Sequence, residues 1–253
     1  MHSENLTHRE FSRNASSSRA IPVKKILAQV WNDPALPIHW GSNQPGMQAG
    51  EELTGWRLAT AKLLWGLAGK TMCAFAWGLM KLGLHKQVVN RILEPWQYIS
   101  VVLTSTQWDN FFSLRDHPDA QPEIQELARA MKKAMEESIP VEGIWHLPYI
   151  GGIEFGEALD SRNCMGRSLD DVFHYLAKLS SARCARVSYL THDGKRPDVA
   201  KDLELFIRLV GSDPIHASPT EHQAQAADDV NVQSGNFRGW HQFRKTHVET
   251  RQT

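Results

Sequence analysis

The sequence predicts a mixed fold of the α/β (α+β) class, because helical patterns and strand-like segments occur in one chain. The longest helical candidate is Glu51 to Leu82, and its segment Leu63 to Met80 is nearly apolar apart from Lys70. The segment Tyr98 to Ser105 has the β-branched and aromatic composition of a buried strand. Two strand candidates and five or six helices in all indicate this class of fold.

The composition indicates a globular protein without a general affinity for nucleic acid. The chain has 253 residues, 42% of them hydrophobic, and its 28 basic side chains balance 28 acidic ones. No overall field therefore steers it toward nucleic acid or an anionic membrane. Cys73, Cys164 and Cys184 form no close pair, which argues against a disulfide framework or a zinc site and favours a reducing compartment. Because the amino terminus lacks the features of a signal peptide, we expect a cytoplasmic protein.

The apolar segment Leu63 to Met80 must also be tested as a membrane span. A span needs about 20 apolar residues, and a central lysine costs about 2.5 to 3.5 kcal/mol on insertion scales. Because Lys70 lies within this segment, we expect a helix buried in a bundle and no membrane association.

Periodicity and turn residues predict the remaining elements. A short helix is expected over Ile21 to Trp31, after Pro22, and then a long ordered loop over Asn32 to Gly50 with Trp40 as a candidate anchor. Further helices are predicted over Trp108 to Arg115, Pro122 to Glu137, and Val199 to Val210 before Gly211. A helix that runs into a strand is predicted over Ser168 to Ser188, with a core stripe of Leu169, Val172, Phe173 and Leu176. Ile139 to Arg167 is Gly-rich and is predicted to be an irregular connection.

Three stretches are rich in groups that bind ligands. Thr7 to Arg19 concentrates arginine, histidine, serine and asparagine, a composition typical of an anion-binding loop and equally of a disordered tail. His216 to His222 holds two histidines and a glutamate, but the histidines are six apart around a proline and do not match usual zinc spacings, so no metal is expected. Ser234 to Arg251 mixes Arg238 and Trp240 with other basic and aromatic residues. That pattern suits either stacking on a nucleotide base or an amphipathic surface strand.

Several separated motifs together resemble those of the flavin-dependent thymidylate synthases. Thr7 to Arg19 is similar to the family signature Arg-His-Arg-x-x-Ser-x-Asn-Glu-x-Ser-x-Arg, with departures at Thr7 and Ala15. Asn90 to Pro95 resembles Ala-Arg-x-x-Leu-Pro, and Asn110 to Arg115 resembles Asn-Phe-x-x-Leu-Arg and is followed by Ala-Gln-x-Glu-Ile. Ala185 to Tyr189 and His216 to His222 resemble Ala-Arg-Val-Ser and His-x-Ser/Thr-Pro-Phe-Glu-His. The last two segments precede the signature in the family and follow it here, so the chain resembles a circularly permuted member.

This resemblance implies an enzyme that methylates dUMP to dTMP. FAD is the cofactor, and NADPH and methylene-tetrahydrofolate are co-substrates. The residues implied to bind FAD are His8, Arg9, Asn110, Ser188, His216, Ser218 and Glu221. Those implied to bind dUMP are Glu4, Ser17, Arg19, Arg91 and Arg115, of which Ser17, Arg91 and Arg115 would be catalytic. A phosphate dianion needs several charge-assisted donors, and an arginine stabilises negative charge that develops on uracil.

The resemblance also implies an architecture and leaves alternatives open. It predicts one domain over residues 1–253 with a central, mainly antiparallel sheet flanked by helices, in a homotetramer whose sites lie between subunits. The family has a strand before the signature, where this chain has six residues, so we expect that strand to be missing or supplied differently. The alternatives are a relative that hydroxymethylates dUMP, a non-catalytic flavin- or nucleotide-binding protein, and a helical interaction protein. Ala15 stands where the family signature has glutamate. We expect it to weaken ligand binding, because an alanine side chain cannot accept the hydrogen bond that glutamate accepts.

Overall fold

The computed structural model describes residues 8–160, 166, 168–188, 190, 194–196 and 198–248. The structure is about 52% helix and 10% strand, with small antiparallel sheets and one long helix, which confirms the predicted α+β class. Contacts divide the chain into two compact units. Unit 1 comprises residues 16–99 and 109–138, and unit 2 comprises residues 8–15, 100–108 and the described part of 139–248.

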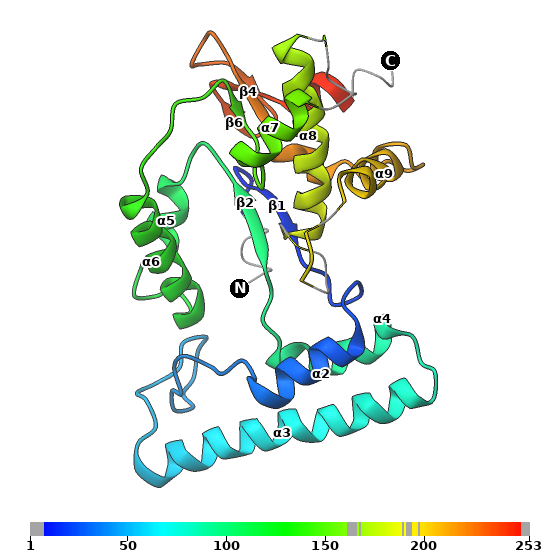
Figure 1. Ribbon diagram of the computed structural model, residues 1–253. Coiled ribbons are helices and arrows are strands. Elements are labelled where there is room, and N and C mark those ends of the chain that lie inside the picture. Colours follow the sequence, from blue (N-terminus) through cyan, green and yellow to red (C-terminus); the bar gives the residue numbers. More distant parts are fainter. Residues whose placement is uncertain are drawn as a thin grey trace. The chain divides into compact units, whose positions relative to one another are not determined.

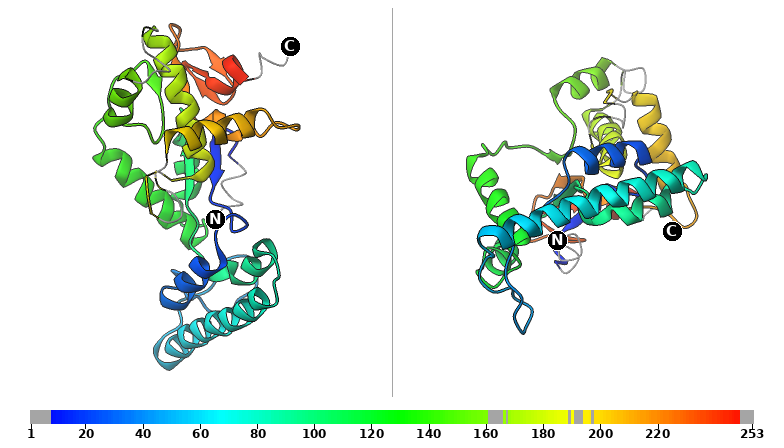
Figure 2. Two further views of the ribbon diagram at one scale, coloured as in Figure 1. Left: turned by 45° about the vertical axis from the view of Figure 1, so that its right-hand side comes forward. Right: turned by 90° about the horizontal axis from the view of Figure 1, so that it is seen from below.

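Unit 1 contains a helical core formed by α2 (Val23–Asn32), α3 (Gly55–Lys81), α4 (Lys86–Val89) and the 3₁₀ segment η1 (Asn90–Trp96). Helix α2 buries Val23, Ile26 and Val30, which recur on one face at helical spacing. This face packs on α3 and η1, and α2 and α3 lie side by side in both views of Figure 2. The predicted helix after Pro22 is confirmed.

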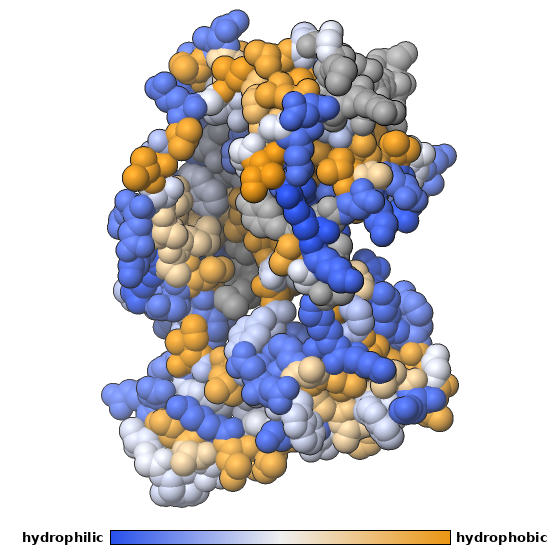
Figure 3. All heavy atoms as spheres, in the orientation of Figure 1, coloured by the Kyte–Doolittle hydropathy of each residue, from blue (hydrophilic) through white to orange (hydrophobic). Residues whose placement is uncertain are grey.

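Helix α3 is packed along one side only. Its buried residues are the small Gly69, Cys73 and Ala76, which allow close approach: a Cβ added to Gly69 would lie 3.0 Å from Trp96. Its large apolar side chains are mostly exposed, among them Trp56, Leu63, Leu64, Leu67, Phe75 and Trp77, and apolar side chains are visible along α3 in Figure 3. The expectation of a helix buried in a bundle is therefore wrong for most of α3 in the single chain. By length and composition α3 is the one described helix that could cross a membrane.

The other predictions for unit 1 hold. Trp40 anchors the long loop after α2 through an edge contact with Trp65, at 6.2 Å between ring centroids. Trp65 also donates to the carbonyl of Ala35 at 3.0 Å. Helices α5 (Asp109–Arg115) and α6 (Pro122–Glu137) lie where helices were predicted and pack on each other.

Unit 2 combines three small antiparallel sheets with helices (Figure 1). Strand β1 (Ser12–Ala15) pairs with β2 (Val101–Thr104), with Ser12 opposite Thr104. The second sheet has the order β3-β4-β7, where the strands are Trp145–His146, Ala224–Ala226 and Trp240–Gln242. The third pairs β5 (Gln233–Ser234) with β6 (Phe237–Arg238).

The helices of unit 2 are α7 (Gly152–Asp160), α8 (Leu169–Arg186), α9 (Val199–Val210), the 3₁₀ turn η2 (Ser218–Glu221) and the π-type turn η3 (Arg244–Val248). The predicted bounds of α9 are confirmed, with Gly211 as its C-cap. The strand predicted at the end of α8 is wrong, because the helix continues to Arg186 and ends at Val187 with φ 53°. Leu169 is exposed and does not belong to the core stripe. The predicted irregular connection contains β3 and α7.

Candidate functional site

The signature stretch is divided between the two units. Residues 8–15 belong to unit 2 and residues 16–19 to unit 1, whereas Thr7 and Glu4 lie outside the described residues. His8 is buried and stacks on Phe11, and Arg9 is exposed. Ser12 to Ala15 form β1, so part of the predicted loop is a strand.

A buried histidine joins two of the matched segments to strand β2 in unit 2. His222 is fully buried, its Nδ1 lies 2.9 Å from Thr104 Oγ1, and its Nε2 lies 3.2 Å from the side-chain amide of Asn14. When the Asn14 amide is oriented to satisfy its neighbours, its nitrogen donates to His222 Nε2 and to the Ser218 carbonyl, each at 3.2 Å. His222 then accepts at Nε2 and donates from Nδ1 to Thr104, an assignment that follows from the hydrogen-bond network.

Burial, reinforced by the nearby His146, lowers the pKa of His222 to about 3. The ring is therefore neutral at pH 7, as the assigned tautomer requires. The junction of Asn14, Thr104 and His222 thus fixes β1, β2 and the His216 to His222 segment by neutral hydrogen bonds.

Unit 2 also holds Ser188, His216, Ser218 and Glu221, which were expected to bind FAD. Helix α8 packs on η2 and on β1, which brings the elements carrying the Ala185 to Ser188 and His216 to His222 motifs together. His216 and Ser218 are exposed, and Ser188 and Glu221 are half-buried. Glu221 forms an ion pair with Arg244.

Arg186 has unused hydrogen-bonding capacity. Its Nη1 pairs with Asp202, but its Nε and Nη2 are buried and have no hydrogen-bond partner among the described residues. Because both nitrogens are closed off from solvent, this edge of the guanidinium is not open to a bound anion in the structure.

Side chains of the carboxy-terminal segment hold the signature stretch in place by hydrogen bonds. Asn236 Oδ1 accepts from Ser12 Oγ at 3.0 Å and from Gln242 Nε2 at 2.9 Å, and Asn236 Nδ2 donates to the Glu10 carbonyl at 2.8 Å. Gln242, on β7, also donates to the Glu221 carbonyl at 3.2 Å. Side chains far along the sequence thus bond to residues 10 and 12 of the signature stretch.

In unit 1 the second half of the signature is tied to the segment that contains Arg91. Asn90 Nδ2 donates to the carbonyls of Ser18 at 2.7 Å and Ile21 at 3.0 Å, and Ser18 Oγ donates to Glu94 at 2.8 Å. The expected dUMP ligands Ser17, Arg19 and Arg91 are all exposed on these segments. The side chain of Asn90 thus holds together the two backbone segments that carry these three residues.

The remaining expected residues lie on α5, in unit 1. Arg115 is half-buried in the last turn, and Asn110 is exposed in the first turn. Asn110 was expected to bind FAD, but the other described residues of that set belong to unit 2.

The described cysteines behave as structural thiols. Burial raises the pKa of the Cys73 thiol and raises that of Cys184 to about 12. Among the described residues there is no group of three or more His, Cys, Asp or Glu side chains that could hold a metal ion.

Comparisons with known proteins found no matching family model, no matching curated protein and no matching solved structure. The geometry of the described residues must therefore support any functional proposal.

Proposed function

We propose that this chain is a flavin-dependent thymidylate synthase that methylates dUMP to dTMP. In this proposal methylene-tetrahydrofolate donates the carbon, and FAD reduced by NADPH provides the hydride. The observation that carries the proposal is the buried junction of Asn14, Thr104 and His222. Asn14 and His222 belong to two motifs that are 208 residues apart in the sequence, yet their side chains are in contact. Motifs that matched the family by chance would have no reason to meet at one buried polar site.

The donors present in unit 2 fit an anionic dinucleotide such as FAD. The exposed Arg9, His216 and Ser218 offer polar groups to the cofactor. Arg9 would bind phosphate, and Ser188, Ser218 and Glu221 would hydrogen-bond the rest of the cofactor. FAD, when bound, supplies the redox chemistry of the reaction.

The exposed groups of unit 1 fit the phosphate of dUMP. A phosphate dianion is bound by convergent arginines and hydroxyls, and Ser17, Arg19 and Arg91 provide these on segments that Asn90 holds together. In this proposal Arg115 lies at the uracil ring and stabilises the negative charge that the ring gains during carbon transfer. Ser17 and Arg91 orient the nucleotide, and Glu4 contributes a polar contact.

The wider assignment follows from the same proposal. The enzyme is a cytoplasmic flavoprotein of dTMP biosynthesis, and it forms a homotetramer in which sites are shared between subunits. The exposed apolar side chains of α3 support an oligomer, because a partner subunit would remove them from water.

The variant Arg115→Ala provides the decisive test. Arg115→Ala is expected to reduce tritium release from dUMP labelled at C5 by about 100-fold or more, because it removes the stabilising charge at the ring. FAD should remain bound, as measured by the visible flavin absorbance of the purified protein. The matched control is Arg57→Ala, an exposed arginine on α3, which should keep wild-type turnover. Normal turnover in Arg115→Ala would contradict the proposal, and a colourless wild-type protein would also contradict it.

Product analysis separates the proposed reaction from its close relative. A hydroxymethylating enzyme would use the same flavin and folate, but its product would be heavier than dTMP by one oxygen. Mass spectrometry of the nucleotide product distinguishes the two. A protein that binds FAD without oxidising NADPH would instead be the non-catalytic binding protein.

A further inference from the structure

A pocket in unit 2 is lined by residues to which the family resemblance assigns no role. Its volume is about 380 Å³, and residues that line it include Ser105, Thr106, His146, Phe237, Arg238 and Trp240. They come from β3, β6, β7 and the segment after β2. Small-molecule sites have volumes of roughly 300 to 1,000 Å³, so this pocket has room for one ring system and its neighbouring groups.

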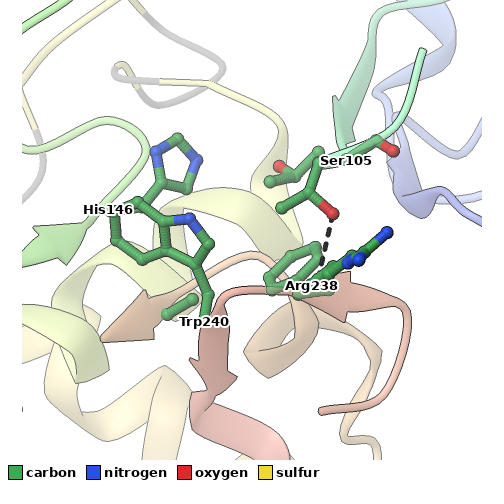
Figure 4. Close-up of a pocket in the computed structure, with 8 residues that line it drawn as sticks. Ser105, His146, Arg238 and Trp240 are labelled. Carbon is green, nitrogen blue, oxygen red and sulfur yellow. Dashed lines mark hydrogen bonds between the residues drawn. The ribbon is translucent and has the colours of Figure 1, made fainter. Parts of the chain in front are cut away.

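The pocket has one aromatic side and one polar side. Figure 4 shows Trp240 and His146 together on one side, and Ser105 and Arg238 opposite them. The backbone N–H of Arg238 donates to Thr106 Oγ1 at 3.0 Å, the bond drawn in Figure 4, and its Nη2 donates to Asn231 at 2.8 Å. The first bond fixes the backbone of β6, and the second positions the guanidinium and leaves it further N–H groups for an anion.

The pocket is built on paired strands. His146 lies opposite Ala224 in the β3–β4 pairing, and Trp240 lies opposite Ala226 in the β4–β7 pairing. Because Ala224 and Ala226 on the central strand β4 have small side chains, they leave space beside the rings of His146 and Trp240. Phe237 and Ala224 are each 1% exposed. The walls are therefore fixed by the sheet and by its apolar base.

We propose that this pocket binds a nucleotide moiety, with its base against Trp240 and His146 and its phosphate at Arg238. An indole face stacks on any heteroaromatic base, and an arginine beside a threonine hydroxyl is suited to phosphate. The inference rests on the proposed function and deepens it by adding a nucleotide site. FAD and dUMP already have residues assigned to them, whereas NADPH has none, so NADPH is the first ligand to test.

The experiment is a calorimetric titration of the full-length protein with NADP⁺, and then with FAD and dUMP. The variants are Trp240→Leu, which removes the indole face, and Arg238→Gln, which removes the charge on an exposed side chain. Each is expected to weaken NADP⁺ binding by about fivefold or more, with an unchanged melting temperature. Matched controls are Trp31→Leu on α2 and Arg208→Gln on α9, both exposed, which should bind NADP⁺ like the wild type.

The outcomes separate this site from the reaction. A loss of affinity for FAD or dUMP in place of NADP⁺ supports the nucleotide site and identifies a different occupant. Unchanged affinity for all three ligands in both variants, or a wild-type protein that binds none of them, overturns the inference. If tritium is released from dUMP while both variants bind normally, the pocket fails and the enzyme proposal stands. If the wild type releases no tritium but the variants lose NADP⁺ binding, the pocket stands and the enzyme proposal fails.

Discussion

The interiors of the two units are stabilised by different interactions. In unit 1 the cluster formed by α2, α3, α4 and η1 is apolar, and Val30, Val89 and Leu93 within it are fully buried. Asn90 is the only buried polar side chain among the described residues of this unit. Unit 1 therefore depends mainly on the apolar area it removes from water and on close packing.

Unit 2 buries many polar and charged side chains. Arg183, Asp202, His222, Gln223 and Gln242 are each at most 2% exposed. Such groups are costly to bury unless they are bonded, and they specify one arrangement of their neighbours. We infer that unit 1 is sensitive to side-chain volume, whereas unit 2 is sensitive to charge, pH and the loss of single hydrogen bonds. The described candidate FAD residues other than Asn110 therefore lie in unit 2, on the more precisely fixed framework.

The largest effect is expected at Arg183. It bonds Asp202 at 3.2 Å, Glu154 at 3.0 Å and the Tyr149 carbonyl at 2.7 Å. Arg183→Met is expected to lower the free energy of unfolding by about 3 to 5 kcal/mol, because two carboxylates lose a buried partner. Urea denaturation measures this change. The exposed Arg208→Met is the control, and similar stability of the two variants would contradict the importance of buried charge in unit 2.

A volume change should dominate in unit 1. Leu93→Ala removes a fully buried side chain from the apolar cluster and is expected to cost about 2 to 5 kcal/mol, through lost burial and the cavity left behind. The control is Leu82→Ala, at a position that is 84% exposed. Because no titrating group is involved, the cost should be the same in urea denaturation at pH 5 and at pH 7. A cost that changed with pH would break the comparison.

The pH dependence should come from unit 2, through His222. Burial lowers its pKa from 6.5 to about 3, so below pH 6.5 the unfolded chain takes up a proton that the folded protein does not. The neutral His222 ring therefore contributes its full stabilisation above pH 6.5, and this contribution falls as the pH drops toward 3. Between pH 6.5 and 5 the loss is about 2 kcal/mol relative to His222→Gln, which has no titrating ring. Parallel pH profiles of unfolding free energy for the two proteins would contradict this assignment.

The sequence predicted elements well where local signals were strong. The predicted bounds of α6 and α9 match the structure, since Pro122 begins one helix and Gly211 follows the other. The strand that was predicted at the end of Ser168 to Ser188 does not form. In the structure, backbone bonds to the carbonyls of Arg183 and Cys184 hold Val187 in a left-handed conformation as the helix cap. Local capping bonds at the helix end thus outweigh the β propensity of valine at that position.

The candidate site was predictable only in part. The family-like motifs drew attention to Asn14, the His216 to His222 segment and the exposed arginines. They gave no role to Asn90, which stands where the matched motif has alanine, or to Asn236, although the amides of both bond groups up to 226 residues away in the sequence. A buried amide has no sequence signature, because its role depends on partners that only the fold brings near. His146 was missed for a similar reason, since its two-residue strand is too short for a periodic pattern.

The smallest effect, and the most local one, is expected at Asn236. Asn236→Ala removes three hydrogen bonds, to Ser12, Gln242 and the Glu10 carbonyl, and should cost about 1 kcal/mol because the side chain is only half-buried. Hydrogen exchange should become faster at the amides of residues 10–15 and stay unchanged in α2. The control is the exposed Gln233→Ala on β5. If residues 10–15 exchanged at the wild-type rate in Asn236→Ala, pairing with β2 alone would hold the signature strand, and the carboxy-terminal side chains would not be needed to fix it.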